Sequence, residues 1–156
     1  MIRVTVNDRA HELSPPADAS LADALRDELG LIGVRVSCNE GECGSCTVLV
    51  DDQPVTACLM LAHQAAGRTV RTIEDFGSPG DLHPIQQAFI DEQGFQCGFC
   101  TPGLIIAAAA FLAEHPSPTE EEASLAMSGN ICRCGAYPYI VRAVMTAAAR
   151  LRGETA

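Results

Sequence analysis

Lysine and tryptophan are absent from this chain of 156 residues, and aromatic residues make up only 4% of it. Without large aromatic rings, the core must be built from aliphatic side chains and alanine, for which a hydrophobic content of 47% is ample. The 10 basic residues are therefore all arginines, and they face 20 Asp and Glu residues, for a net charge of −10. This acidic balance argues against binding to nucleic acid or to an anionic membrane surface.

Long hydrophobic segments are also missing. The longest apolar run covers residues 104–113, whereas a helix needs about 20 apolar residues to cross a bilayer. The chain starts with the alternating pattern of a strand and not with a basic segment before an apolar stretch, so we expect no signal peptide and a cytoplasmic location. In that compartment, clustered cysteines predict metal binding or redox chemistry rather than disulfides.

The first half of the chain holds four of the eight cysteines, in the spacing C-x4-C-x2-C-x11-C: Cys38, Cys43, Cys46 and Cys58. This spacing is typical of plant-type ferredoxins, which hold a [2Fe–2S] cluster. Three thiols on one short loop and a fourth after a connecting segment can reach two irons from two directions. Gly41 and Gly44 let the loop bend tightly and direct N–H groups at the sulfurs. The alternatives are a structural zinc site and unrelated buried cysteines.

The other four cysteines form two pairs, each just before a predicted helix: Cys97, Cys100, Cys132 and Cys134. Unpaired N–H groups and the positive end of the dipole stabilise thiolates at helix N-termini. Taken alone, this second set fits either an iron–sulfur cluster or zinc, although C-x-C is tight for a zinc knuckle. A thioredoxin-like dithiol would use Cys97 and Cys100 and leave the other pair unexplained.

Hydrophobic periodicity divides the chain into two parts. Alternation predicts strands, with one helix that begins at a capping box formed by Ser20 and Asp23. The predicted strands cover residues 2–6, 10–13, 47–50, 54–56 and 69–73. Beyond residue 83 the period becomes helical, and helices are predicted over 84–93, 101–114, from about 120 up to 128, and 138–151. Thr101 is the expected N-cap of the helix over 101–114. Leu151 is the last residue of the helix over 138–151 that is expected to face inward.

The predicted fold class is therefore α+β. Residues 1–75 are expected to form a β-grasp, ferredoxin-like domain, and residues 82–152 a four-helix bundle. Residues 76–81 form a linker by composition. We further expect exposed apolar surface around the cysteine loops. The four histidines have no metal-ligand spacing and are assigned no role.

Two longer motifs carry a family resemblance. They are Gln96-Cys-Gly-Phe-Cys-Thr-Pro-Gly103 and Gly129-Asn-Ile-Cys-Arg-Cys-Gly-Ala-Tyr137. Together with the first cysteine motif and the domain order, they resemble the iron–sulfur subunit of the xanthine oxidase, or molybdenum hydroxylase, family. The resemblance extends over nearly the whole chain, from Ile2 to about Leu151.

This resemblance implies two [2Fe–2S] clusters. The first cysteine set would hold the cluster distal to molybdenum, and the second set the proximal one, buried against the molybdopterin. Carried over from the family motif, Gln96 would contact the pterin and Cys134 would lie next to its amine.

The function implied is that of an electron-transfer subunit in a multi-subunit oxidoreductase. Single electrons would pass from the molybdopterin through both clusters to FAD or an external acceptor. A large molybdopterin-binding partner would oxidise an aldehyde or an N-heteroaromatic compound. The sequence contains no G-x-G-x-x-G or other nucleotide loop, so molybdopterin and FAD are expected on partner chains, and no residue here is expected to do acid–base chemistry.

Two other functions fit the motifs less well. A free-standing two-cluster electron carrier would have no use for a pterin contact at Gln96. A zinc-stapled interaction protein would hold zinc in place of iron. The substrate and the terminal acceptor depend on partner chains and are not encoded here.

Overall fold

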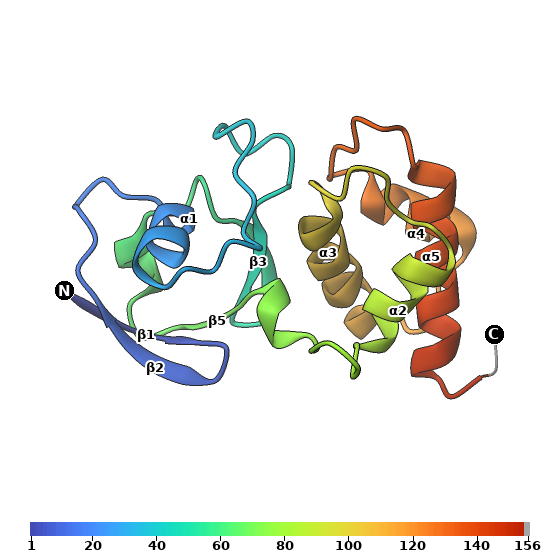
Figure 1. Cartoon of the computed structure of the whole chain (residues 1–156), viewed down its shortest axis with the longest axis horizontal. Helices are drawn as coiled ribbons and strands as arrows, with labels where there is room; N and C mark the ends of the chain where they lie inside the picture. Colours follow the sequence, from blue (N-terminus) through green and yellow to red (C-terminus); the bar gives the residue numbers. More distant parts are fainter. Residues whose placement is uncertain (155–156) are drawn as a thin grey trace.

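The computed structural model describes residues 1–154 and has two halves that lie side by side (Figure 1). The N-terminal half contains a sheet and the C-terminal half contains four helices. Each half has its own cluster of buried hydrophobic residues. The fold is α+β, as predicted. No helix within residues 1–154 is both long and apolar enough to cross a membrane.

Five short strands form the sheet, in the order β2-β1-β5-β3-β4. They are β1 Ile2–Val6, β2 Arg9–Leu13, β3 Thr47–Val50, β4 Gln53–Thr56 and β5 Thr69–Arg71. Only the β1–β5 pair is parallel. The turns at Asn7-Asp8 and Asp51-Asp52 have positive φ at both central residues, as two-residue hairpins require. Alternation and turn chemistry therefore predicted both hairpins and the four strands that form them, with bounds correct to within one residue.

The helix that crosses the sheet begins at the predicted capping box. The Asp23 N–H donates to Ser20 Oγ at 3.1 Å, and the Ser20 N–H donates to the Asp23 carboxylate at 3.2 Å. It is α-helical only over α1, Leu21–Asp23, and continues as the π-helical turn η1, Ala24–Glu28. Gly30 follows with φ +69°, the left-handed conformation that ends many helices.

Four helices pack around the second core: α2 Pro84–Asp91, α3 Thr101–Glu114, α4 Glu120–Met127 and α5 Tyr137–Leu151. Helix α3 is the central element, because it contacts β3 and β4 as well as α2 and α4 (Figure 1). An apolar helix without a polar face is expected at such a buried position. Helix α3 thus joins the two halves.

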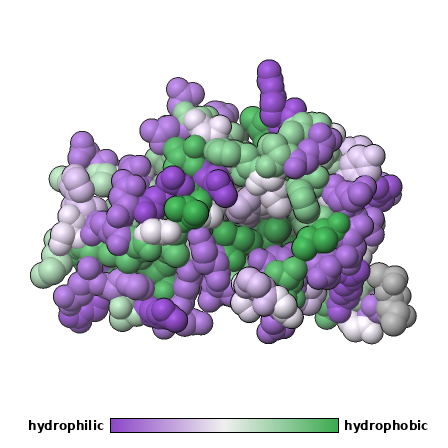
Figure 2. All heavy atoms as spheres, viewed as in Figure 1, coloured by the Kyte–Doolittle hydropathy of each residue, from purple (hydrophilic) through white to green (hydrophobic). Residues whose placement is uncertain are grey.

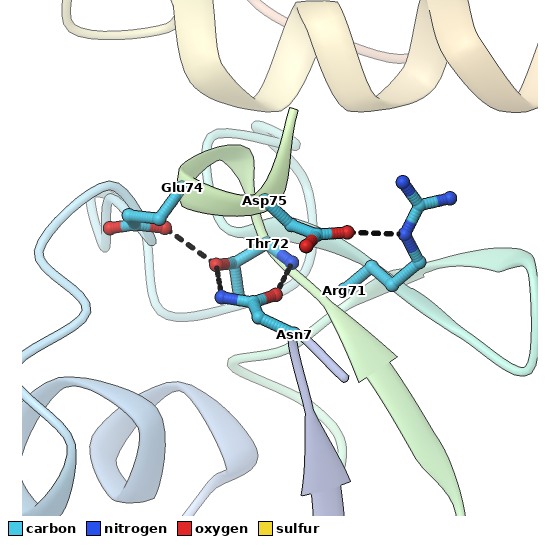
Figure 3. Close-up of polar contacts among 5 residues, drawn as sticks. All are labelled: Asn7, Arg71, Thr72, Glu74 and Asp75. Atoms are coloured by element: carbon cyan, nitrogen blue, oxygen red, sulfur yellow. Dashed lines mark hydrogen bonds and ion pairs between the residues drawn. The ribbon is translucent and has the colours of Figure 1, made fainter. Parts of the chain in front are cut away.

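Short 3₁₀ helices occupy Ala62–Ala65, η2, and Ile73–Asp75, η3. The strand predicted over 69–73 therefore ends early, at Arg71. The physical reason is a polar network at the ends of β1 and β5 (Figure 3). Asn7 Nδ2 donates to Thr72 Oγ1 and the Thr72 N–H donates to Asn7 Oδ1, both at 2.9 Å. Thr72 thus pairs with a side chain instead of a neighbouring strand.

Glu74 extends this network toward the first cysteine loop. Thr72 Oγ1 donates to Glu74 Oε2 at 2.6 Å, and the other Glu74 oxygen accepts from the Gly33 N–H at 2.8 Å. Arg71 pairs with Asp75 at 2.7 Å in the same region (Figure 3). Phe76, the first residue of the predicted linker, is buried in the helical core. The connection between the halves is therefore anchored on both sides.

Two helix-end predictions were wrong. Thr101 is the first helical residue and Cys100 occupies the N-cap position, so Thr101 does not cap α3. Leu151 is 46% exposed, because it lies at the last turn of α5, beyond the core. The other predicted inward residues of α5 are buried: Ile140, Val141, Val144 and Ala148.

Candidate metal centres

The loops that carry most of the cysteines lie along one side of the molecule, at the top of the view in Figure 1. The first loop turns by positive φ at Asn39, Gly41 and Gly44. This brings the N–H groups of Glu40 and Cys43 to 3.4 Å from Cys38 Sγ. The Cys58 N–H lies 3.5 Å from Cys46 Sγ. Backbone N–H groups therefore point at the sulfurs, as the glycines predicted.

The second cysteine set is assembled at the N-termini of α3 and α5. Cys97 and Cys100 precede α3, while Cys132 and Cys134 precede α5. Gln96 Nε2 contacts the Cys134 carbonyl oxygen at 3.5 Å and so links the two arms.

Within each set the thiols are arranged in pairs. In the first set, Cys43 acts on the pKa of Cys38 and Cys58 acts on that of Cys46, so these are close neighbours. In the second set, Cys134 acts on the pKa of Cys97 and Cys132 on that of Cys100. In addition to burial, the charge of Cys43 raises the pKa of Cys46, and the charge of Cys97 raises the pKa of Cys100. The two pairs of each set therefore lie close to each other.

Each set has an inner pair, which is buried, and an outer pair, which is more exposed. The inner pairs are Cys46 with Cys58 and Cys100 with Cys132; the outer pairs are Cys38 with Cys43 and Cys97 with Cys134. A hydrogen bond from the Glu40 N–H, followed by one from the Cys43 N–H, lowers the pKa of Cys38 to about 7. The Phe99 N–H lowers the pKa of Cys97.

In each inner pair, burial raises the pKa of one thiol instead of lowering it. It raises the pKa of Cys46 to about 11 and the pKa of Cys100 to about 12. Backbone donors thus stabilise the thiolates of Cys38 and Cys97. The thiolates of Cys46 and Cys100 need a bound cation to offset their desolvation. Iron bound at the inner pairs would provide that positive charge.

The paired arrangement fits a [2Fe–2S] cluster. Such a cluster is held by four thiolates, so each of its two irons takes one pair. Within residues 1–154 no group of three or more His, Cys, Asp or Glu side chains is arranged to hold one metal ion. The four thiols of each set equal in number the four thiolates that hold one [2Fe–2S] cluster.

The two sets meet at the junction between the halves. The Ile131 N–H donates to the Cys43 carbonyl at 2.9 Å. Gly103, in the first turn of α3, packs directly on the backbone of Gly44 and Ser45, so that a Cβ would contact both carbonyl oxygens. The first cysteine loop thus lies against both arms of the second set.

The contacts of two residues in this region, and of His83 farther away, escaped the sequence reasoning. Tyr137 accepts a hydrogen bond from the Cys132 N–H and donates one to the Asn130 carbonyl, both at 2.9 Å. Asn130 contacts the first loop, although 86 positions separate it from Gly44. His83 caps α2, because its Nδ1 accepts from the Ile85 N–H at 3.2 Å. The quoted motifs contain Asn130 and Tyr137, but their spacing does not indicate these contacts.

Apolar side chains are exposed near both sets, as predicted. Around the second set they are Ile90, Phe95, Phe99, Ile131 and Tyr139, and near the first set Ile32, Leu59 and Leu61. Figure 2 shows hydrophobic residues among hydrophilic ones on one face of the molecule. Gln96 is exposed beside a hollow of about 470 Å³ that Ile90, Phe95 and Tyr139 also line.

Comparisons with known proteins agree with this geometry. Residues 4–69 match the 2Fe-2S iron-sulfur cluster binding domain, and residues 72–145 match a second [2Fe-2S] binding domain. The nicotine 6-hydroxylase small subunit of Paenarthrobacter nicotinovorans is 47% identical over 94% of this chain and 88% of its own length. The nicotinate dehydrogenase small FeS subunit of Eubacterium barkeri is 44% identical over 96% and 95%. This chain belongs to the iron–sulfur small subunits of the molybdenum hydroxylase family.

Solved structures of other family members have the same fold. Quinoline 2-oxidoreductase from Pseudomonas putida 86 aligns with a TM-score of 0.91 at 40% identity, over 99% of this chain and 97% of the matched chain. Aldehyde oxidoreductase from Desulfovibrio gigas aligns with a TM-score of 0.93 at 42% identity, over 98% of this chain. This chain spans only 17% of that aldehyde oxidoreductase polypeptide. In the family, the same unit therefore occurs both as a separate subunit and as part of a longer chain.

Proposed function

We propose that this chain is the electron-transfer subunit of a multi-subunit molybdenum-containing oxidoreductase. The observation that carries the proposal is the presence of two sets of paired thiols whose loops are hydrogen-bonded to each other. A single redox centre needs only one set. Two adjacent sets, in a chain of this family, support a relay that spans the subunit.

The proposed ligands of the distal cluster are Cys38, Cys43, Cys46 and Cys58, and those of the proximal cluster are Cys97, Cys100, Cys132 and Cys134. A bound [2Fe–2S] cluster accepts and releases one electron at a time. The chain supplies the surroundings: N–H groups of Glu40, Cys43 and Cys58 near the sulfurs of the first set would offset the negative charge added on reduction.

A large molybdopterin-binding partner is proposed to cover the second set. In support, Gln96 and Cys97 are exposed, and the apolar side chains around them form a hollow surface suited to a partner. Gln96 and Cys134 are the proposed pterin contacts. A FAD-binding subunit or another acceptor would approach the first set, where Leu59 and Leu61 are exposed.

The substrate would be oxidised on the large partner. Relatives of this chain are subunits named for nicotine, nicotinate and caffeine, and others are named for aldehydes. An N-heteroaromatic compound or an aldehyde is therefore the proposed substrate class. A cytoplasmic location stays a prediction.

The proposed domain organisation has a β-grasp ferredoxin-like domain over residues 1–75 and a four-helix bundle over 82–152, with a linker over 76–81. The two separate hydrophobic cores support this division. Burial of Phe76 in the helical core suggests that this end of the linker is anchored to the bundle.

Purification of the native complex tests the proposed function. Two [2Fe–2S] clusters predict about four irons per chain and two distinct rhombic signals in the electron paramagnetic resonance (EPR) spectrum of the reduced protein. A larger chain that contains molybdenum should copurify. A lone stable chain without molybdenum would support a free-standing carrier, and zinc in place of iron would contradict the cluster assignment.

A further inference from the structure

Asn130 is a buried polar residue whose side chain reaches from the helical half into the first cysteine loop. It is only 5% exposed. Its Nδ2 donates to the Gly44 carbonyl at 2.9 Å and lies 3.5 Å from Thr47 Oγ1. Gly44 lies between Cys43 and Cys46, so this amide is bonded to the loop that carries three thiols of the first set.

The backbone around Asn130 is bonded to the second set. Its carbonyl oxygen accepts from the Tyr137 hydroxyl, and the same hydroxyl accepts from the Cys132 N–H. The next residue, Ile131, donates its N–H to the Cys43 carbonyl at 2.9 Å. One short segment, directly before Cys132, therefore holds two donors to the first loop and an acceptor for the Tyr137 hydroxyl.

The contact leaves no room for adjustment. A Cβ at Gly44 would lie 2.6 Å from Asn130 Nδ2, and a Cβ at Gly103 would contact the Gly44 carbonyl oxygen. The Gly44 carbonyl also accepts from Thr47 Oγ1 at 2.6 Å. The Thr47 N–H donates to the same carbonyl at 3.1 Å, and both Thr47 donors lie close to Gly44 in the sequence. The Asn130 amide is the donor that reaches this carbonyl from the helical half, so its removal should let the two loops separate or reorient.

We propose that Asn130 is a positioning residue that sets the distance and orientation between the two cysteine sets, and thereby the electronic coupling between the clusters bound there. This inference rests on the proposed function. Asn130 binds neither cluster; it acts through the Gly44 carbonyl. Electron transfer slows steeply with distance, so a side chain that clamps the loops together controls transfer between them.

The test compares EPR spectra of the fully reduced native complex and of variants. Both reduced clusters are paramagnetic, and their dipolar coupling falls with the cube of their separation, so the coupling reports the geometry directly. Asn130→Ala should weaken this coupling while the iron content stays unchanged. Ser128→Ala is the matched control, because Ser128 is exposed and its hydroxyl donates only to Leu125 within its own helix end.

A second variant keeps the test decisive if Asn130→Ala does not retain its clusters. Thr47→Val removes the other side-chain donor to the Gly44 carbonyl and preserves the shape of the side chain. Thr47→Val should weaken the dipolar coupling between the reduced clusters less than Asn130→Ala does.

The possible outcomes are distinct. If Asn130→Ala melts at a lower temperature but keeps the wild-type coupling, Asn130 is merely structural and the inference is overturned. If Asn130→Ala loses its clusters, unchanged coupling in Thr47→Val overturns the inference. Wild-type protein with fewer than two reduced signals would instead contradict the proposed function, independently of Asn130.

Discussion

The first cysteine set occupies one loop and the turn after β4, so that only a hairpin separates its two parts, whereas α3 and α4 separate the two arms of the second set. The geometry of the first set depends on local backbone turns at Gly41 and Gly44. The geometry of the second depends on how α3 and α5 pack. Nevertheless, both sets have a buried inner pair and a more exposed outer pair. Loops and helix ends thus produce the same arrangement of thiols.

The first loop is also supported by contacts from the helical half. The first loop packs on Gly103 and accepts hydrogen bonds from Asn130 and Ile131, all from the helical half. A loop with few regular hydrogen bonds of its own gains rigidity from these contacts. The first set, whose geometry comes from turns within one loop, is therefore supported by residues next to the second set.

The largest expected effect comes from Cys134→Ala, which removes one thiol of the second set. We expect iron to fall from about four to about two per chain, with loss of the proximal EPR signal and of turnover. The ferredoxin-type signal should remain, because its four thiols are unchanged. Metal analysis and EPR of the reduced complex check this. Loss of both signals would mean that the two sets are not independent.

Gly103→Ala tests the packing between the sets. The new Cβ would contact the Gly44 carbonyl oxygen and lie 3.0 Å from the Ser45 carbonyl oxygen. Because both are backbone atoms, overpacking should cost about 1–3 kcal/mol of the free energy of unfolding. Thermal unfolding of the complex measures it. Gly129→Ala is the control, since a Cβ there meets no atom within 4 Å; equal melting temperatures for the two variants would contradict the prediction.

Tyr137→Phe tests the second set alone. It removes the hydroxyl that accepts from the Cys132 N–H and donates to the Asn130 carbonyl. We expect a loss of about 1–2 kcal/mol of stability, because both groups lose a partner in a half-buried site. Chemical denaturation should show the loss of stability. The EPR spectrum of the reduced complex should show a changed proximal signal. Tyr139→Phe serves as control, because Tyr139 is 41% exposed, and it should match the wild type.

The smallest effect is expected from Thr119→Ala, far from both sets. The Thr119 backbone N–H, and then its hydroxyl, donate to Glu122 and lower the pKa of that carboxyl. Loss of the capping box at α4 should cost about 0.5–1 kcal/mol near neutral pH.

This effect should depend on pH with a defined sign. Because the folded-state pKa of Glu122 is lowered, its contribution is present above the ordinary glutamate pKa and lost as the pH falls through the lowered value. The stability difference between the wild type and Thr119→Ala should therefore shrink in acid, where the bond from the Thr119 hydroxyl to the Glu122 carboxylate is lost. It should not vanish, because the Glu122 N–H still donates to the Thr119 hydroxyl of the wild type. Denaturation across acidic pH measures this, and a constant difference would contradict the assignment.

Most of the fold followed from local patterns. Alternation, two-residue turns and capping boxes depend on neighbours in the sequence, so β1, β2, β3 and α4 were predicted with nearly correct bounds. Errors occurred where a distant partner intervened. Strand β5 ends early because Thr72 pairs with Asn7. A separate, local error placed the N-cap of α3 at Thr101, one residue after its position at Cys100.

The sequence by itself determined the eight candidate ligands and the family, because metal-binding thiols are chemically distinctive and their spacing is short and regular. Only the tertiary structure decided how the thiols pair, which of them are buried, and that Asn130, Ile131 and Gly103 bring the two sets together. The physical reason is that these features arise from contacts across the junction between the sheet and the helices. The periodicity and spacing of residues along the sequence do not indicate which carbonyl a buried amide such as that of Asn130 will donate to.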